Sequence, residues 1–209
     1  MNLFLVISFI VLVIAFIIYA YYSSLFDSAT ITRGPFQELY VAYITNKGDY
    51  KEAWNHYHEI CTIINNRGCQ KDARLLPSIG LYYDNPQNVT DKAQLRSSIG
   101  IIVDEDWFNS NVNKQINDKL RFGKINALKD SLQVRFPQRS MLGIFTALKK
   151  VYPQIFKYLE DHNVKNNEMT EIAEIYNFEK GKMIFLLGLG TREENDFMTT
   201  IPETYDFKS

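Results

Sequence analysis

A glutamate and a tyrosine two residues apart, Glu174 and Tyr176, are the side chains whose types and spacing best suit chemistry. In a β-strand, alternate residues point to the same face, so these two side chains would lie side by side. A carboxylate among aromatic rings attracts cations by its charge, and the rings add cation–π contacts. Burial without a partner would also raise the pKa of the carboxyl group, which could then act as a general base. The alternative is a rim glutamate that forms an ion pair with a lysine.

Strands must hold this pair in place, and the clearest strand pattern lies earlier in the chain. Apolar residues recur with a period of two at 79–84 and again at 98–103, which is typical of β-strands. Gly80 and Gly100 lie in the middle of these strands, where glycine indicates a bulge or the close approach of another group. Tyr82 shares a strand face with Gly80 and is therefore a further candidate for a ligand site.

The predicted elements repeat in the same order along the chain. In the first repeat, a strand begins at Pro35, a helix runs from Asp49 to Arg67, and the strands at 79–84 and 98–103 follow. In the second repeat, a strand at 131–136 is followed by a helix capped by Ser140 and by strands at 171–177 and 181–189. The order strand, helix, strand, strand thus appears twice, which indicates a duplicated half-domain. One antiparallel sheet with two helices on one face is the α+β arrangement that buries such elements. Pro153 is expected to kink or split the second helix, because proline removes a backbone donor.

The segment between the two repeats has a less regular pattern. Val112, Ile116 and Leu120 are four residues apart, which predicts a short helix that ends just before Gly123. The pair Trp107-Phe108 follows three acidic residues and has two interpretations. It could be an exposed anchor for a protein partner, or its rings could fold back onto the core, where large aromatic side chains usually lie.

The turn Tyr83-Asp84-Asn85-Pro86, the pair Leu95-Arg96 and the strand after it resemble the gyrase-inhibitor-like (GyrI-like) small-molecule-binding superfamily. The similarity is greatest to a membrane-anchored branch typified by a testis-expressed ER-phagy receptor. It runs from about Phe36 to Leu187 and includes the apolar leader. The resemblance implies a pseudo-twofold domain, with the ligand cleft where the two halves meet.

The same resemblance implies a role for the first pair of residues. In this superfamily a glutamate-x-tyrosine pair near the start of the penultimate strand contributes its glutamate to the cleft, and Glu174 and Tyr176 match it. There the glutamate meets cationic or electrophilic aromatic ligands, and in some members it assists hydrolysis. This chain departs from the pattern, because Asn177-Phe178-Glu179 stands where a proline often follows.

The N-terminal segment from Leu3 to Ala20 is almost wholly apolar. A helix that crosses the hydrocarbon of a bilayer needs about 20 such residues, and Tyr19, Tyr21 and Tyr22 then stand where interfacial aromatic residues are expected. A cleaved signal peptide is the alternative, but no basic residue precedes the run and no small-x-small cleavage site follows it. We therefore predict a transmembrane anchor at 1–22, a connector at 23–34, a GyrI-like domain at 35–190 and an acidic tail at 191–209.

The composition argues against several classes of function. The formal net charge is −1 and no basic stripe is present, so the chain lacks the electrostatic signature of a nucleic-acid-binding protein. Cys61 and Cys69 fit no zinc spacing, although a disulfide between them stays open. His56 and His58 point to different sides of a helix. No metal site, cofactor motif or phosphate-binding loop is predicted.

Three functions are compatible with these patterns. The first is a non-catalytic, single-pass membrane protein that serves as an accessory subunit of a larger complex, in the mitochondrial inner membrane or the endoplasmic reticulum. The second is an ER-phagy-receptor-like membrane tether, which rests on the resemblance alone. The third is a small-molecule binder or hydrolase that uses Glu174. The expected partners are the lipid bilayer, other membrane-complex subunits and, for the third function, a small aromatic or cationic ligand.

Overall fold

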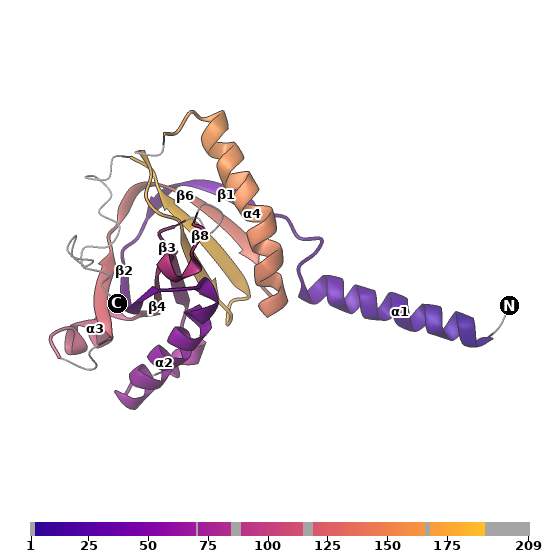
Figure 1. Ribbon diagram of the computed structural model, residues 1–209, viewed down its shortest axis with the longest axis horizontal. Helices are drawn as coiled ribbons and strands as arrows, with labels where there is room; N and C mark the ends of the chain where they lie inside the picture. The colour runs from indigo at the N-terminus through magenta and orange to yellow at the C-terminus, as the bar shows by residue number, and fades with distance from the viewer. Residues whose placement is uncertain (1–2, 70, 85–88, 115–118, 166–167, 191–209) are drawn as a thin grey trace.

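The computed structural model describes residues 3–69, 71–84, 89–114, 119–165 and 168–190. Its folded domain is one antiparallel sheet that carries two long helices, and the N-terminal helix projects away from it (Figure 1). The strands are β1 (Thr30–Phe36), β2 (Leu39–Lys47), β3 (Ser78–Tyr82), β4 (Arg96–Val103), β5 (Arg121–Ile125), β6 (Leu128–Pro137), β7 (Ala173–Asn177) and β8 (Lys182–Gly188). The helices are α1 (Leu3–Tyr22), α2 (Ala53–Asn66), α3 (Glu105–Asn111) and α4 (Met141–Asp161). The predicted acidic tail at 191–209 lies outside the described residues.

The order of the strands in the sheet confirms the predicted duplication. The order is β1-β6-β8-β7-β3-β4-β2-β5. The first half-domain is therefore β2-α2-β3-β4, the second is β6-α4-β7-β8, and they meet where β3 pairs with β7. At this junction Gly80 pairs with Glu174 and Ile79 pairs with Ile175, so the sheet has its pseudo-twofold centre at the candidate site.

The two outer strands exchange between the halves, which the sequence did not indicate. β1 precedes the first half in the chain but pairs with β6 of the second, whereas β5 precedes the second half and pairs with β2 of the first. Strand structure begins at Thr30, inside the segment predicted as a connector at 23–34. Arg33 on β1 forms a two-pronged hydrogen-bonded ion pair with Asp130 on β6, which links these two strands.

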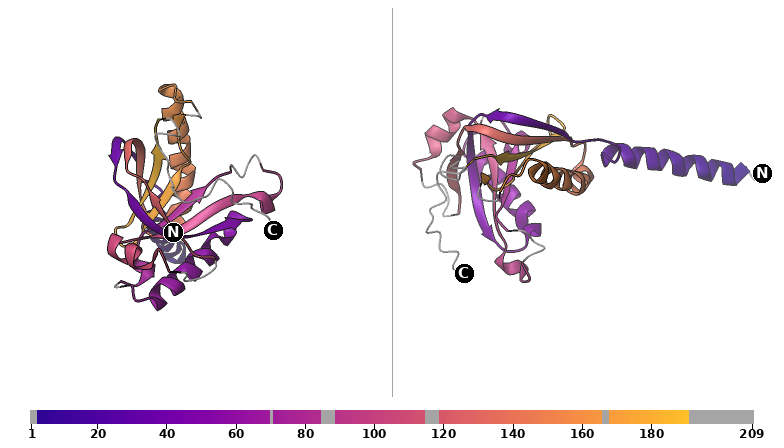
Figure 2. Two further views of the ribbon diagram at one scale, coloured as in Figure 1. Left: turned by 90° about the vertical axis from the view of Figure 1, so that its left-hand side faces the viewer. Right: turned by 90° about the horizontal axis from the view of Figure 1, so that it is seen from above.

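Both long helices cover the same face of the sheet, as predicted. On α2, Ile60 and Ile64 are fully buried in a cluster that includes Ile99 and Ile101 of β4. On α4, the buried face at Ala147, Val151, Ile155 and Leu159 packs on residues of β6 and β8. The two clusters are separate, because each helix covers its own half of the sheet. α2 and α4 consequently lie apart from one another on the sheet (Figures 1 and 2).

The segment between the two halves differs from the prediction of a helix at 112–120. The observed helix, α3, lies earlier, because the Asp104 side chain accepts a hydrogen bond from the backbone N–H of Trp107 and caps it there. Gly123 does not follow a helix but lies in β5, where it pairs with Val41. Leu120 is buried just before that strand. Ile116 lies outside the described residues.

α4 begins at the predicted cap, but it is not split at Pro153. Ser140 caps the helix by accepting a hydrogen bond of 3.1 Å from the N–H of Leu142. The helix then continues through Pro153 to Asp161 without splitting. The apolar face of α4 lies on both sides of the proline and packs on one continuous surface of the sheet, which holds the two parts in a single helix.

α1 has the length and composition of a helix that can cross a membrane, and it is the only such helix among the described residues. Its end is fastened to the beginning of α4. The hydroxyl of Ser140 donates a hydrogen bond to the carbonyl of Tyr22 at 2.8 Å. Lys150 donates to the carbonyl of Asp27 at 2.8 Å, and Arg139 forms an ion pair with the side chain of Asp27. This ion pair lowers the pKa of Asp27. The helix therefore meets the domain at a defined position.

The close packing at Gly100 provides a test of the sheet. A Cβ atom at this position would lie 2.5 Å from Val41 Cγ1 and 3.0 Å from the carbonyl oxygen of Ala42. We expect Gly100→Ala to lower the free energy of unfolding by about 1–3 kcal/mol through overpacking. The control is Gly143→Ala inside α4, whose Cβ would make an ordinary contact of 3.5 Å with Ser24. That change should raise stability by up to about 1 kcal/mol through helix propensity. Denaturant unfolding in mild detergent measures the free energy of unfolding of both variants. Equal changes in the two variants would contradict the packing described.

Candidate ligand-binding site

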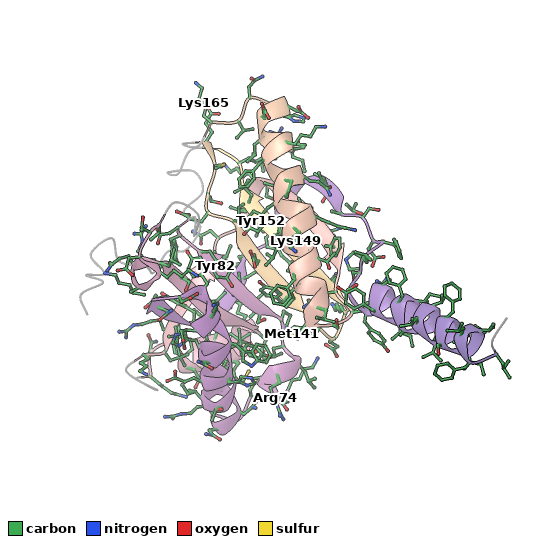
Figure 3. The ribbon with its side chains drawn as sticks, turned by 45° about the vertical axis from the view of Figure 1, so that its right-hand side comes forward. Arg74, Tyr82, Met141, Lys149, Tyr152 and Lys165 are labelled. Atoms are coloured by element: carbon green, nitrogen blue, oxygen red, sulfur yellow. The ribbon has the colours of Figure 1, made fainter. Side chains whose placement is uncertain are left out.

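A cleft of about 1480 Å³ lies between α2 and α4, above the central strands of the sheet. Tyr82 on β3 and Tyr152 on α4 both lie in the space between the two helices (Figure 3). Aromatic side chains from both helices form much of its walls; among them are Trp54 and Tyr57 on α2, and Phe145, Tyr152 and Phe156 on α4. The cleft is thus located where the two half-domains meet.

Glu174 lies at the floor of this cleft and is only 3% exposed. Its position follows from the pairing of β7 with β3, which sets Glu174 opposite Gly80 on the helix-covered face. The phenol of Tyr152 donates a hydrogen bond to Oε1 at 2.6 Å, and the phenol of Tyr176 donates to Oε2. The predicted pair of Glu174 and Tyr176 therefore shares one face of its strand and is in direct contact.

Gly80 provides the space for the third predicted site residue. A Cβ atom on Gly80 would lie 2.9 Å from the ring of Tyr82, so the absence of a side chain lets this ring lie over the strand. The ring of Tyr50 packs edge-on against Tyr82 at 4.8 Å between centroids. The hydroxyl of Tyr50 also donates to the backbone carbonyl of Asp84 at 2.7 Å. Tyr82 is thereby held beside the glutamate and its tyrosine partner.

Burial determines the pKa values of Glu174 and of the tyrosines around it. Desolvation raises the pKa of Glu174, and the hydrogen bonds from Tyr152 and Tyr176 partly oppose this effect. Burial and the nearby carboxylate raise the pKa of Tyr152 and of Tyr176. Burial is also the main cause of the raised pKa of Tyr82. The phenols consequently stay protonated at neutral pH and act as hydrogen-bond donors. Among the ion pairs of the described residues, none includes Glu174.

The aromatic pair at 107–108 lies elsewhere. Trp107 and Phe108 are buried, at 8% and 5% exposed, and do not line the cleft. Phe108 packs against Tyr40 with 5.1 Å between ring centroids, and both aromatic residues contact the ring of Phe122. The structure therefore agrees with the interpretation in which the rings fold onto the core, and the prediction of an exposed docking anchor is corrected. The buried rings fasten α3 to the edge of the sheet.

The described residues contain no group of three or more histidine, cysteine or acidic side chains that could hold a metal ion. Cys61 is buried in the core and Cys69 is partly exposed, and both are free thiols. Burial raises the pKa of Cys61, which makes this thiol a poor nucleophile. At the floor of the cleft, the carboxylate of Glu174 lies with the phenols of Tyr152 and Tyr176.

Sequence reasoning missed two members of the site, Tyr152 and Tyr50. In the sequence, both tyrosines follow the helical spacing of the apolar residues around them, which gives neither one a role in a site. The signal was the phenol itself, because a tyrosine on a buried helix face needs a hydrogen-bond partner. The identity of that partner depends on the approach of α4 to β7, which lies beyond local sequence patterns.

A duplicated α+β domain with an aromatic cleft and a buried acid at its centre defines a class of small-molecule-binding domain. A family model described as the GyrI-like small molecule binding domain matches residues 35–181. This chain belongs to that family.

The curated relatives include the testis-expressed protein 264 homolog of Mus musculus, which is 26% identical over 192 residues, or 89% of this chain and 57% of the relative. Testis-expressed protein 264 of Homo sapiens is 27% identical over 162 residues, or 74% of this chain and 48% of the relative. The chain thus spans about half the length of these relatives. A solved structure of an uncharacterized conserved protein from Listeria innocua is 15% identical, with a TM-score of 0.48 over 78% of this chain and 92% of that one.

The hydrogen bond from Tyr152 to Glu174 generates a prediction. Tyr152→Phe removes one of the two phenolic donors to a buried carboxylate, so the pKa of Glu174 should rise further. At a pH where Glu174 is ionised, stability should fall by about 1–3 kcal/mol, the typical cost of losing such a bond. The carboxyl carbon signals of ¹³C-labelled glutamate, followed by NMR against pH, measure the shift. In the Glu174→Gln background the same tyrosine change should have a smaller effect on stability, and an equal effect would contradict the assigned bond.

Proposed function

We propose that this protein is a membrane-anchored receptor that binds a small aromatic cation in the cleft between α2 and α4. The observation that supports this function best is the carboxylate of Glu174, which is buried at the floor of an aromatic cleft and forms none of the ion pairs found among the described residues. Leaving an ionised carboxylate in such a place is costly, because the protein interior replaces little of its hydration. A cationic ligand would supply the missing charge.

The walls of the cleft favour the same class of ligand. Rings such as those of Trp54, Tyr82 and Phe156 line the space above the carboxylate and can pack against an aromatic ligand or attract its charge. Small-molecule sites commonly measure roughly 300–1,000 Å³, so a cleft of about 1480 Å³ has room for a bulky ligand. The polar groups at the floor are few and convergent, which is typical of a site that orients its ligand by one charge.

Binding is favoured over catalysis by the chemistry of the groups around Glu174. The raised pKa values of Tyr152 and Tyr176 make these phenols unsuitable as bases near neutral pH. A hydrolase would then depend on Glu174 alone to activate water, and both of its oxygens already accept a phenolic hydrogen bond. A hydrolytic activity stays a prediction that product formation would reveal.

We further propose that α1 anchors the receptor as a single membrane span. The helix is 20 residues long and is exposed over nearly its whole length, which suits hydrocarbon rather than water as its surroundings. The mitochondrial inner membrane and the endoplasmic reticulum are the two locations that the sequence predicted. The accessory-subunit role and the ER-phagy-receptor-like tether stay predictions, and neither requires an open cleft with a buried acid. The cleft therefore makes ligand binding our first proposal.

The ligand site is tested by Glu174→Gln, with tetraphenylphosphonium as the probe cation and isothermal titration calorimetry as the measurement. The change keeps the shape of the side chain but removes its charge, so the affinity should fall at least tenfold, which is a loss of about 1.4 kcal/mol. The matched control is Glu179→Gln, a change to an exposed glutamate that pairs with Lys71 outside the cleft. Unchanged affinity in Glu174→Gln, or an equal loss in the control, would contradict this site.

The same proposal fixes the sign of the pH dependence. Because the pKa of Glu174 is raised above its ordinary value of 4.5, the acid is protonated in part of the range above that pH, and a cation must compete with this proton. Affinity should therefore increase as the pH rises from about 4.5 through the raised pKa, and Glu174→Gln should abolish the increase. The contribution of Glu174 to the free energy of unfolding has the opposite trend, because it is greatest below the unfolded pKa and is lost as the pH rises through the raised pKa.

The anchor is tested separately, by replacing Val11 and Ile14 in the middle of α1 with arginine. Each arginine at the centre of a span costs about 2.5–3.5 kcal/mol on insertion scales, so the double variant should lose stable insertion. The control places two arginines at the exposed positions Asn109 and Ser110 on α3. After alkaline carbonate extraction, the unmodified chain and the control should stay with the membrane pellet and the double variant should not. Recovery of the unmodified chain in the supernatant would exclude an anchor, and a mature mass without the leader would identify a signal peptide.

A further inference from the structure

Exposed apolar side chains stand on α4 at the mouth of the cleft and beside α1, where a surface helix normally carries polar ones. Met141, Leu142 and Phe145, here named the α4 rim, are 45%, 49% and 65% exposed. Phe156, farther along the same helix, is 53% exposed. The opposite side of α4 is already buried against the sheet, so the rim is not part of the core. Contiguous exposed apolar side chains of this kind mark a contact surface.

The rim lies directly beside the end of α1. Met141 and Leu142 line one shallow depression together with Ala15 and Ile18 of α1. Met141 also stands at the end of α4 that is nearest to α1 (Figure 3). The hydrogen bond from Ser140 to the carbonyl of Tyr22 holds the two helices together at this point. The rim thus shares its position along the α1 axis with the last apolar turns of that helix.

This position determines the depth of the rim if α1 spans a bilayer. A helix of 20 residues measures about 30 Å at 1.5 Å per residue, which matches the hydrocarbon thickness, so its last turn reaches the headgroup region. α4 lies on the side of the domain from which α1 emerges (Figures 1 and 2). The first turn of α4 must consequently come close to the membrane surface, with its apolar side chains next to lipid.

The charges on α4 suit the same surroundings. Between Arg139 and Leu159 the sequence contains no aspartate or glutamate, and Lys149 is exposed one helical turn after Phe145. Apolar side chains that insert near the acyl boundary, with a lysine beside them for lipid phosphates, are the pattern of an interfacial helix. An acidic stripe at this position would instead be repelled by anionic lipids.

We propose that the α4 rim inserts into the headgroup region of the bilayer that α1 spans, so that the domain has a second membrane contact. Met141 and Phe145 also line the cleft, which places one edge of its mouth at the lipid surface and gives membrane-partitioned amphiphilic cations a direct route to it. This inference rests on the proposed anchor, because the depth of the rim follows from the position of α1. The experiment below can nevertheless contradict the rim contact without contradicting the anchor.

Site-directed spin labelling of the full chain tests the contact. A nitroxide is attached at Phe145→Cys, in a Cys69→Ser background, after reconstitution in vesicles of phosphatidylcholine and phosphatidylglycerol. Phe145 is mostly exposed, so the label should not disturb folding. The control labels are at Ser110→Cys on α3, which is exposed and lies far from α1, and at Val11→Cys in the middle of α1 (Figure 1). The measured quantity is the ratio of nitroxide collisions with oxygen, which concentrates in lipid, to collisions with a water-soluble nickel chelate.

The label at residue 145 should show a several-fold higher oxygen-to-nickel ratio than the label at residue 110, and a lower ratio than the label at residue 11. A ratio at residue 145 equal to that at residue 110, while residue 11 reads as buried in lipid, would overturn the rim contact and leave the anchor intact. Aqueous readings at all three positions would overturn the anchor itself. Low collision rates with both reagents at residue 145, with dipolar broadening between labels, would show that a second copy covers the rim and would overturn the lipid contact.

Discussion

The burial of one carboxylate is the constraint on which this structure depends. Glu174 sits at the centre of the sheet, where the halves meet, and is nearly inaccessible to water. Two phenols donate to its oxygens, which keeps the group hydrogen-bonded but supplies no positive charge. A wholly apolar side chain at this position would satisfy the packing of a duplicated sheet at lower cost. Our proposal for the acid at this position is a ligand that brings a cation to it.

The duplicated fold explains why such a site forms at this place. Each half-domain buries its own helix against its own strands, so two separate apolar clusters leave a gap above the junction of β3 and β7. Gly80 keeps that junction open for the ring of Tyr82, and Tyr152 reaches the acid from α4. α4 also bears the fastening to α1 and the exposed apolar rim. One helix thereby connects the ligand cleft to the proposed membrane anchor.

Local patterns in the sequence predicted most of the repeated elements and three of the residues that line the cleft, Glu174, Tyr176 and Tyr82. Period-two alternation located the central strands, and the spacing of Glu174 and Tyr176 placed both on one face. The exchange of the outer strands could not be predicted, because it depends on which edge a strand joins and not on its own residues. The helix expected at 112–120 is not found in the described part of that segment, because the cap at Asp104 begins a helix earlier and Leu120 leads into β5. The role of Tyr152 likewise required the tertiary approach of α4.

The central claim is that Glu174 is a buried acid whose negative charge is balanced by a cationic ligand. Proton release on ligand binding tests this claim most directly. Calorimetric titrations with tetraphenylphosphonium, repeated in buffers of different ionisation enthalpy at a pH near the raised pKa of Glu174, count the protons that leave the protein. The account predicts net release, because the cation binds the ionised form, and predicts that Glu174→Gln removes it. Heats that are independent of the buffer while binding stays tight, or net proton uptake, would contradict it.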